Sequence, residues 1–255
     1  MPHIYCTICQ NLLHFFAEMI RAASKRSRFP AARNRQEFTM KHIIFFDLDG
    51  TLTDSGEGIT NCVIHALQKQ DWPIPDSDSL RRFIGPPLID SFQGIAGMNA
   101  AQAAQAVTDY RARYSTVGLF ENRAYDGIVD TLAALKAAGK RLFLVTSKPE
   151  DYSIRIAERF GLAPYLEEIC GATLDGRINT KDAVVRLALE RAGQPDPADI
   201  EMVGDRLHDV EGARKYGIDC TYVLYGFGTR EEAEAHHAAH IVATVDELRE
   251  HLLAL

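Results

Sequence analysis

The sequence is 255 residues long, 46% hydrophobic and 25% charged, as expected of a globular enzyme that can bury a core and carry a modest insertion. The net charge of −7 argues against nucleic acid or an anionic membrane as a partner, and no apolar run approaches the roughly 20 residues that span a bilayer. Five scattered cysteines are too few for a disulfide framework in a chain of this length, so we expect a reducing, cytoplasmic setting.

The first 39 residues differ from the rest of the chain. They carry six basic and two acidic side chains, a net charge of +4, which leaves −11 for the remainder. Pro30 breaks any long helix, and Met40 opens a segment typical of the first strand of a domain. We therefore expect residues 1–39 to be a basic tail, disordered or non-native. Cys6 and Cys9 form one CxxC pair, whereas structural zinc sites usually show two ligand pairs.

From Met40 onward, strand-like and helix-like segments alternate. The apolar run at 42–46 is typical of a strand buried on both faces. Further strands are predicted at 141–145, 165–172, 200–203, 220–224 and 240–243, with helices at about 128–138, 150–160 and 181–192. This alternation predicts an α/β fold with a Rossmann-like parallel sheet and helices on both faces.

The interval from Ser55 to about Tyr125 breaks this alternation. It contains no convincing strand and several helical stretches, such as residues 100–114. We expect residues 56–125 to form an inserted, all-helical cap, and residues 40–55 and 126–255 to form the core. An insertion directly after the first strand is well placed to act as a lid over a site at the end of that strand.

The strongest chemical signal is the motif Asp47-Leu48-Asp49-Gly50-Thr51, directly after the first predicted strand. Ligands of open parallel sheets bind at the carboxyl ends of the strands. Side chains alternate along an extended chain, so the two aspartates can project to the same side, where they would repel unless a cation lies between them. Such a pair suits a division of roles in which one carboxylate attacks phosphorus and the other protonates the leaving oxygen.

Three more polar clusters follow later strands or open a helix. Thr146 and Ser147 end the second strand, where a hydroxyl and free backbone amides can hold phosphate oxygens, and Lys148 is either a substrate contact or a solvated side chain. Lys181 opens a helix and can face the same site beside the positive helix end. Asp205 and Asp209 are four residues apart, so in a helical turn they share a face, and hard oxygen ligands of this kind suit Mg²⁺.

Taken in this order, DLDGT, a strand-terminal threonine, an isolated lysine and GDxxxD resemble the haloacid dehalogenase superfamily of phosphatases over roughly residues 41–255. The resemblance implies that Asp47 is the nucleophile and that Asp49 is the general acid and then the general base. It implies that Thr146 binds the phosphoryl group, and that Lys181 neutralises this group and the nucleophile.

The same resemblance implies a Mg²⁺ cofactor. The ion would be held by Asp47, the main-chain carbonyl of Asp49 and Asp205, with Asp209 acting through water or as a further ligand. The helical insertion is similar to a C1-type cap. Together with the FIGPPL segment at 83–88, it makes the chain similar to phosphoglycolate phosphatases and related 5′-nucleotidases.

We therefore expect hydrolysis of a small phosphorylated metabolite by a monomer or homodimer, with phosphoglycolate as the first candidate substrate. The alternatives are a 5′-nucleotidase and a sugar phosphomutase of the same superfamily. Phosphoglycolate would need a cation for its carboxylate, for which Arg81 and Arg82 are candidates, and a nucleotide would need an apolar shelf, for which Phe83 and Phe92 are candidates. The sequence contains no GxxxxGK[ST] loop, which disfavours an ATP-driven kinase.

Overall fold

The computed structural model describes residues 41–255, so the predictions for the tail, Cys6 and Cys9 lie outside the described residues. Within this range the core is one sheet of six parallel strands in the order β5-β4-β1-β6-β7-β8. The expected Rossmann-like α/β fold is confirmed. The strands are β1 (Ile43–Phe46), β4 (Arg141–Pro149), β5 (Glu168–Ala172), β6 (Ile200–Gly204), β7 (Asp219–Val223) and β8 (His240–Val242).

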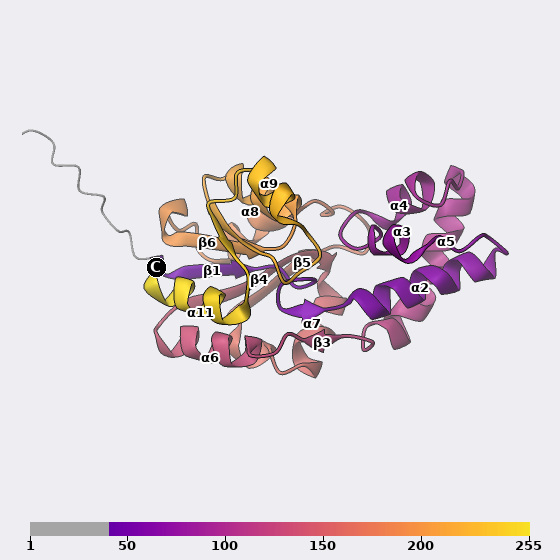
Figure 1. The fold of residues 1–255 in the computed structure, drawn as a ribbon. Helices are drawn as coiled ribbons and strands as arrows, with labels where there is room; N and C mark the ends of the chain where they lie inside the picture. The colour runs from indigo at the N-terminus through magenta and orange to yellow at the C-terminus, as the bar shows by residue number, and fades with distance from the viewer. Residues whose placement is uncertain (1–40) are drawn as a thin grey trace, which may run out of the picture. The chain divides into compact units, whose positions relative to one another are not determined.

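Helices cover both faces of this sheet (Figure 1). Because side chains alternate along a strand, Ile44 and Phe46 of β1 enter one apolar cluster, and Ile43 and Phe45 enter the other. The first cluster is covered by α6 (Ile128–Ala137), α7 (Glu150–Arg159) and α11 (Val245–Ala254). The second is covered by α8 (Lys181–Arg191), α9 (Leu207–Arg214) and α10 (Arg230–Ala235).

The strand register brings the carboxyl ends of the central strands together. Phe46, the last residue of β1, pairs with Leu144 of β4 on one side and with Val203 of β6 on the other. The backbone N–H of Asp47 continues this pairing by donating to the Val203 carbonyl at 2.9 Å. The polar segments that follow these three strands therefore meet at one edge of the sheet, the usual place for a ligand site in such folds.

A helical segment lies between β1 and β4, as the sequence predicts, and Figure 1 shows it at one end of the sheet. A short antiparallel ribbon joins its two ends, with Thr53 opposite Ala124 and Asp54 opposite Arg123. No strand is predicted in this interval, and two-residue strands are too short to show the alternation that predicts one. The segment consists of β2 (Thr53–Asp54), α2 (Gly56–Lys69), α3 (Ser77–Arg81), α4 (Leu88–Gly94), α5 (Ala100–Arg113), a π-helix (Tyr114–Gly118) and β3 (Arg123–Ala124).

Two predicted boundaries differ from the structure. The strand predicted at 165–172 begins at Glu168, because residues 163–165 form a 3₁₀ turn that contains Pro164. The strand predicted at 141–145 continues to Pro149, and its pairing with β5 shifts register between Thr146 and Pro149. This irregular end of β4 carries three of the predicted site residues. The boundaries of the predicted core and cap stay predictions.

Candidate active site

The turn after β1 gives the two aspartates a common direction. The backbone N–H groups of residues 51–53 all donate to the Leu48 carbonyl, at 3.3, 2.9 and 2.9 Å. The Leu48 side chain is fully buried, whereas Asp47 and Asp49 on either side of it are partly exposed. The alternation expected from the sequence therefore holds through the turn, and both carboxylates face away from the apolar core.

Lys181, the first residue of α8, binds the first of these aspartates. Its Nζ lies 2.8 Å from Asp47 Oδ1 and 2.7 Å from Asp209 Oδ1, and it donates to the Val145 carbonyl at 3.0 Å. The side chain is only 4% exposed. Burial disfavours the charged form, but the carboxylates of Asp209 and Asp47 outweigh this effect and raise the pKa of Lys181, so the ammonium stays charged.

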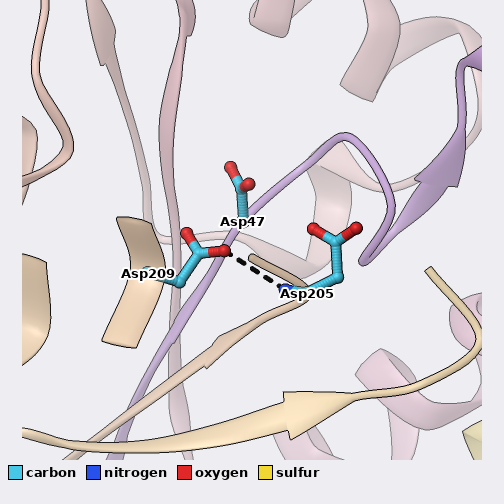
Figure 2. A group of neighbouring side chains, drawn as sticks. All are labelled: Asp47, Asp205 and Asp209. Atoms are coloured by element: carbon cyan, nitrogen blue, oxygen red, sulfur yellow. Dashed lines mark hydrogen bonds between the residues drawn. The ribbon is translucent and has the colours of Figure 1, made fainter. Parts of the chain in front are cut away.

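Asp205 and Asp209 lie beside Asp47, as Figure 2 shows. The predicted reason for this proximity, a shared helical face, is wrong, because α9 begins only at Leu207 and Asp205 lies in the turn before it. Asp209 instead folds back, and its Oδ2 accepts the backbone N–H groups of Asp205 at 3.2 Å and Arg206 at 3.0 Å. A carboxylate in the first helical turn satisfies free N–H groups in this way and is favoured by the helix dipole.

These three aspartates fit a divalent cation. Each offers a carboxylate oxygen, and the three oxygens lie within 4.8 Å of one another. Burial raises the pKa of Asp205 well above its usual range and that of Asp209 to about 6, and neighbouring carboxylates, including Asp47, add to this. A bound cation would reverse this effect and favour the ionised forms.

Asp205 provides the clearest indication of where such an ion would bind. Its Oδ2 accepts the backbone N–H of Phe227 at 2.7 Å, but its fully buried Oδ1 has no hydrogen-bond partner among the described residues. Buried polar atoms are nearly always satisfied, so a free carboxylate oxygen fits a metal ligand. Gly50 lets the Asp205 carboxylate lie against the turn after β1, because a Cβ at this position would lie 2.0 Å from Asp205 Oδ2. Its φ of 80° also favours glycine.

The second aspartate of the turn has a lysine of its own. Lys148 Nζ lies 2.8 Å from Asp49 Oδ1 and 2.7 Å from Asp49 Oδ2, and the lysine side chain is only 6% exposed. The alternative that Lys148 is simply solvated is therefore wrong. From the sequence we expect one cation between the two aspartates, whereas the structure has two buried lysines, one for each carboxylate. Lys148 also hydrogen-bonds the phenol of Tyr114, which belongs to the helical insertion.

Thr146 and Ser147 lie at the irregular end of β4. Thr146 is 2% exposed, and its hydroxyl accepts the backbone N–H of Lys148 at 3.3 Å. Ser147 is exposed. The structure therefore brings Asp47, Asp205, Asp209 and Lys181 into one contact network, and Asp49 and Lys148 into a second beside it. Their roles in binding substrate, and those of Thr146 and Ser147, stay predictions.

The cap residues proposed for substrate selection lie differently from one another. Arg81 and Arg82 are exposed. Phe83 and Phe92 are 1% and 0% exposed and pack edge to face with their ring centroids 5.2 Å apart. Their rings are therefore part of the apolar core of the insertion and offer no free shelf to a nucleobase.

Arg206 contacts the helical insertion directly, a role that the sequence did not reveal. Its Nη1 donates to the Ile84 carbonyl at 2.8 Å, and its Nε donates to Glu232 at 3.1 Å. Gly85 follows with φ of 106°, and a Cβ there would lie 2.8 Å from Arg206 Nη1. Tyr114 was also missed, because an isolated tyrosine at a helix end carries no chemical signal in one sequence.

Comparisons with known proteins agree with this geometry. Residues 44–223 match the family described as haloacid dehalogenase-like hydrolase. The chain is 42% identical over 207 residues to a 5′-nucleotidase of Pseudomonas aeruginosa, which covers 81% of this chain and 93% of the relative. It is 40% identical over 212 residues to the tyrosine-protein kinase PtkA of Mycobacterium tuberculosis, which covers 82% and 72%.

A phosphoglycolate phosphatase of Caulobacter vibrioides is 29% identical over 196 residues, which covers 75% of this chain and 82% of the relative. Among solved structures, a predicted phosphatase from Clostridium acetobutylicum is 43% identical, with a TM-score of 0.80 over 85% of this chain and 100% of that one. The family match, these relatives and the site geometry agree. The chain belongs to the haloacid dehalogenase-like hydrolases and is a phosphatase of that family.

Proposed function

We propose that this phosphatase hydrolyses a small phosphate monoester through a phosphoryl-aspartate on Asp47, and that a nucleoside 5′-monophosphate is its substrate. One observation carries the mechanism. Two aspartates of one turn face the same edge of the sheet, and each has its own buried lysine, Lys181 for Asp47 and Lys148 for Asp49. Two carboxylates two residues apart can therefore divide the work, with Asp47 as the nucleophile and Asp49 as the proton carrier.

In the first step, a carboxylate oxygen of Asp47 bonds to phosphorus and the ester P–O bond breaks. Asp49 gives its proton to the leaving oxygen, which departs as an alcohol. In the second step, Asp49 takes a proton from water as the water oxygen attacks the phosphoryl-aspartate. The bond between Asp47 and phosphorus breaks, and inorganic phosphate is released. Lys181, whose Nζ lies 2.8 Å from Asp47 Oδ1, orients this carboxylate for attack and offsets negative charge on the phosphoryl group that it then carries.

Asp47, Asp205 and the main-chain carbonyl of Asp49 would hold Mg²⁺, with Asp209 helping through water. When bound, the ion supplies positive charge that stabilises the phosphoryl oxygens and the ionised carboxylates. Asp209 fits the indirect role better, because its oxygens already face Lys181 and two backbone N–H groups.

The choice of substrate follows from the relatives. From the sequence alone we expect phosphoglycolate first and nucleoside monophosphates second. The relative named 5′-nucleotidase is 42% identical to this chain, and the one named phosphoglycolate phosphatase is 29% identical. The relative named for a nucleotide substrate is the more similar of these two, so we now place nucleoside monophosphates first.

The mechanism is tested with Asp47→Asn, which keeps the volume of the side chain but removes the nucleophile. We expect turnover to be lost and acid-quenched protein to carry no labelled phosphoryl group, whereas the wild type carries one. Asp54→Asn is the matched control, because the Asp54 carboxylate pairs with the exposed Arg123 in the ribbon and accepts the backbone N–H of Gly56, so the change should leave turnover unchanged. Turnover by Asp47→Asn at the wild-type rate would exclude the mechanism.

The substrate is tested by phosphate release from nucleoside 5′-monophosphates, phosphoglycolate and sugar phosphates in the presence of Mg²⁺. The highest kcat/KM should fall on a nucleoside monophosphate, and the highest value on phosphoglycolate would reverse our order. Transfer of the phosphoryl group to a second sugar hydroxyl, with little release to water, would favour the phosphomutase alternative.

A further inference from the structure

A tyrosine of the helical insertion makes direct contact with the acid–base part of the site. Tyr114 is 3% exposed, and its hydroxyl oxygen accepts a hydrogen bond from the ammonium of Lys148. The same ammonium contacts both carboxylate oxygens of Asp49, at 2.8 and 2.7 Å. A continuous chain of contacts therefore runs from the insertion through Lys148 to the proposed proton carrier.

The local fold fixes the Tyr114 ring in this position. Tyr114 is the first residue of the π-helix that follows α5, and its ring stacks on Tyr110 with centroids 5.2 Å apart and planes at 14°. Tyr152 of α7 packs edge-on against it at 5.8 Å. Gly118 leaves the space that the ring needs, because a Cβ there would lie 2.8 Å from Tyr114 Cδ2. Short π-helical turns are often found at functional sites.

The phenol has the protonation state that this contact needs. Burial, together with the negative charge of Asp49, raises the pKa of Tyr114 well above its usual range, so the hydroxyl stays neutral at physiological pH. A neutral hydroxyl oxygen accepts a hydrogen bond from the ammonium of Lys148, and Asp49 remains the charged partner of that ammonium. Lysine has a flexible four-carbon side chain, so an ammonium with a vacant donor can reorient.

We propose that Tyr114 is a positioning residue for catalysis, which holds Lys148 against Asp49 when the insertion is seated on the core. This inference rests on the proposed function, because it assumes that Asp49 carries the proton. Without the phenol, Lys148 loses one of its fixed partners, and Asp49 loses the orientation that proton transfer to the leaving oxygen requires. Errors of about 1 Å in such groups can lower rates about 100-fold.

The test compares substrates that differ in their need for a general acid. An alkyl phosphate has a poor leaving group and depends on proton donation, whereas p-nitrophenyl phosphate releases a stable phenolate and depends on it little. The value of kcat/KM is measured for both esters, because it reports the steps through formation of the phosphoryl-aspartate. For Tyr114→Phe we expect a loss of about 10- to 100-fold with the alkyl ester, and of less than about threefold with the aryl ester.

Tyr110→Phe is the matched control, since Tyr110 stacks on the same ring but the phenol that Lys148 binds is that of Tyr114, and it should leave the ratio of the two kcat/KM values unchanged. This ratio does not depend on the fraction of protein that is folded, so partial unfolding of a variant does not affect the test. Equal losses on both esters, or the same change of ratio in Tyr110→Phe, would overturn the proposal.

A double-mutant comparison tests whether Tyr114 acts through Asp49. Asp49→Asn should itself lower the alkyl-to-aryl ratio more than Tyr114→Phe does. Tyr114→Phe added to Asp49→Asn should then change the ratio no further, because the group that it positions is gone. Independent, multiplicative losses would contradict the proposal. If the wild type cleaves neither ester, the proposed function fails, which is a different outcome from failure of the role of Tyr114.

Discussion

The buried ammonium of Lys181 provides the sharpest test of the site energetics. Lys181→Met keeps a side chain of similar length but removes the charge that lies 2.8 Å from Asp47 and 2.7 Å from Asp209. At an effective dielectric constant near 20, each contact is worth about 6 kcal/mol before desolvation is counted. Desolvation offsets much of this sum. Measured losses on removing one partner of a buried ion pair are about 3–5 kcal/mol, and we expect a loss of that size.

The assay is urea unfolding at pH 7.5 in chelator, so that no bound cation replaces the missing ammonium. The midpoint should fall with little change in slope, because the surface exposed on unfolding is similar. Lys215→Met is the matched control. Lys215 pairs with Asp182 at 3.0 Å but is 60% exposed, and the loss should be below about 1 kcal/mol. A loss below about 1 kcal/mol for Lys181→Met as well would refute the assignment of Lys181 as the cation that stabilises this site.

Three further predictions concern the metal, the pH and the contact with the insertion. Chelation should abolish turnover, and Mg²⁺ should restore it. Ca²⁺ should restore turnover poorly, because it prefers more ligands at longer distances. Full activity in excess chelator would contradict the role of Asp205. The pKa of Asp209 is raised to about 6 and that of Asp205 well above its usual range, so the metal-free folded protein binds more protons than the unfolded chain between about pH 4 and pH 6. The contribution of these two carboxyls to metal-free stability should therefore fall as pH rises through this window, and the urea midpoint of the wild type should fall relative to that of Asp209→Asn. Gly85→Ala should raise KM, because the added methyl group contacts Arg206. Gly97→Ala is the control and should leave KM unchanged, since Gly97 also has a positive φ but has open space around it. Equal KM values for the two variants would exclude the Arg206 contact as the cause.

The fold could be predicted closely because its signals are local. Each buried strand is a short apolar run, and each polar motif directly follows a strand or opens a helix. Parallel pairing then brings the strand ends together whatever the exact register. The contacts between these motifs could not be predicted from the sequence. Lys148 immediately precedes Pro149 in a polar segment, and its partner Asp49 lies 99 residues away in the chain.

The position of Asp209 shows a right prediction made for a wrong reason. A spacing of four residues indicates a shared helical face, but the helix begins too late for Asp205 to belong to it. The two aspartates lie close because Asp209 accepts the free N–H groups before the helix. The sequence also could not reveal Tyr114 or Ile84 as contacts of the core, since their partners lie 34 and 122 residues away.

The bond from Arg206 to the insertion has a practical consequence for changing substrate preference. The acceptor is the main-chain carbonyl of Ile84, so the bond does not depend on which side chains the segment 83–88 carries. Pro86, Pro87 and Leu88 are not fully buried and can be randomised in a library without removing this anchor. Gly85 is kept, because its φ of 106° is strained for other residues and a Cβ there would lie 2.8 Å from Arg206 Nη1. Selection from such a library on different phosphate esters would explore substrate range while the catalytic edge of the sheet stays fixed.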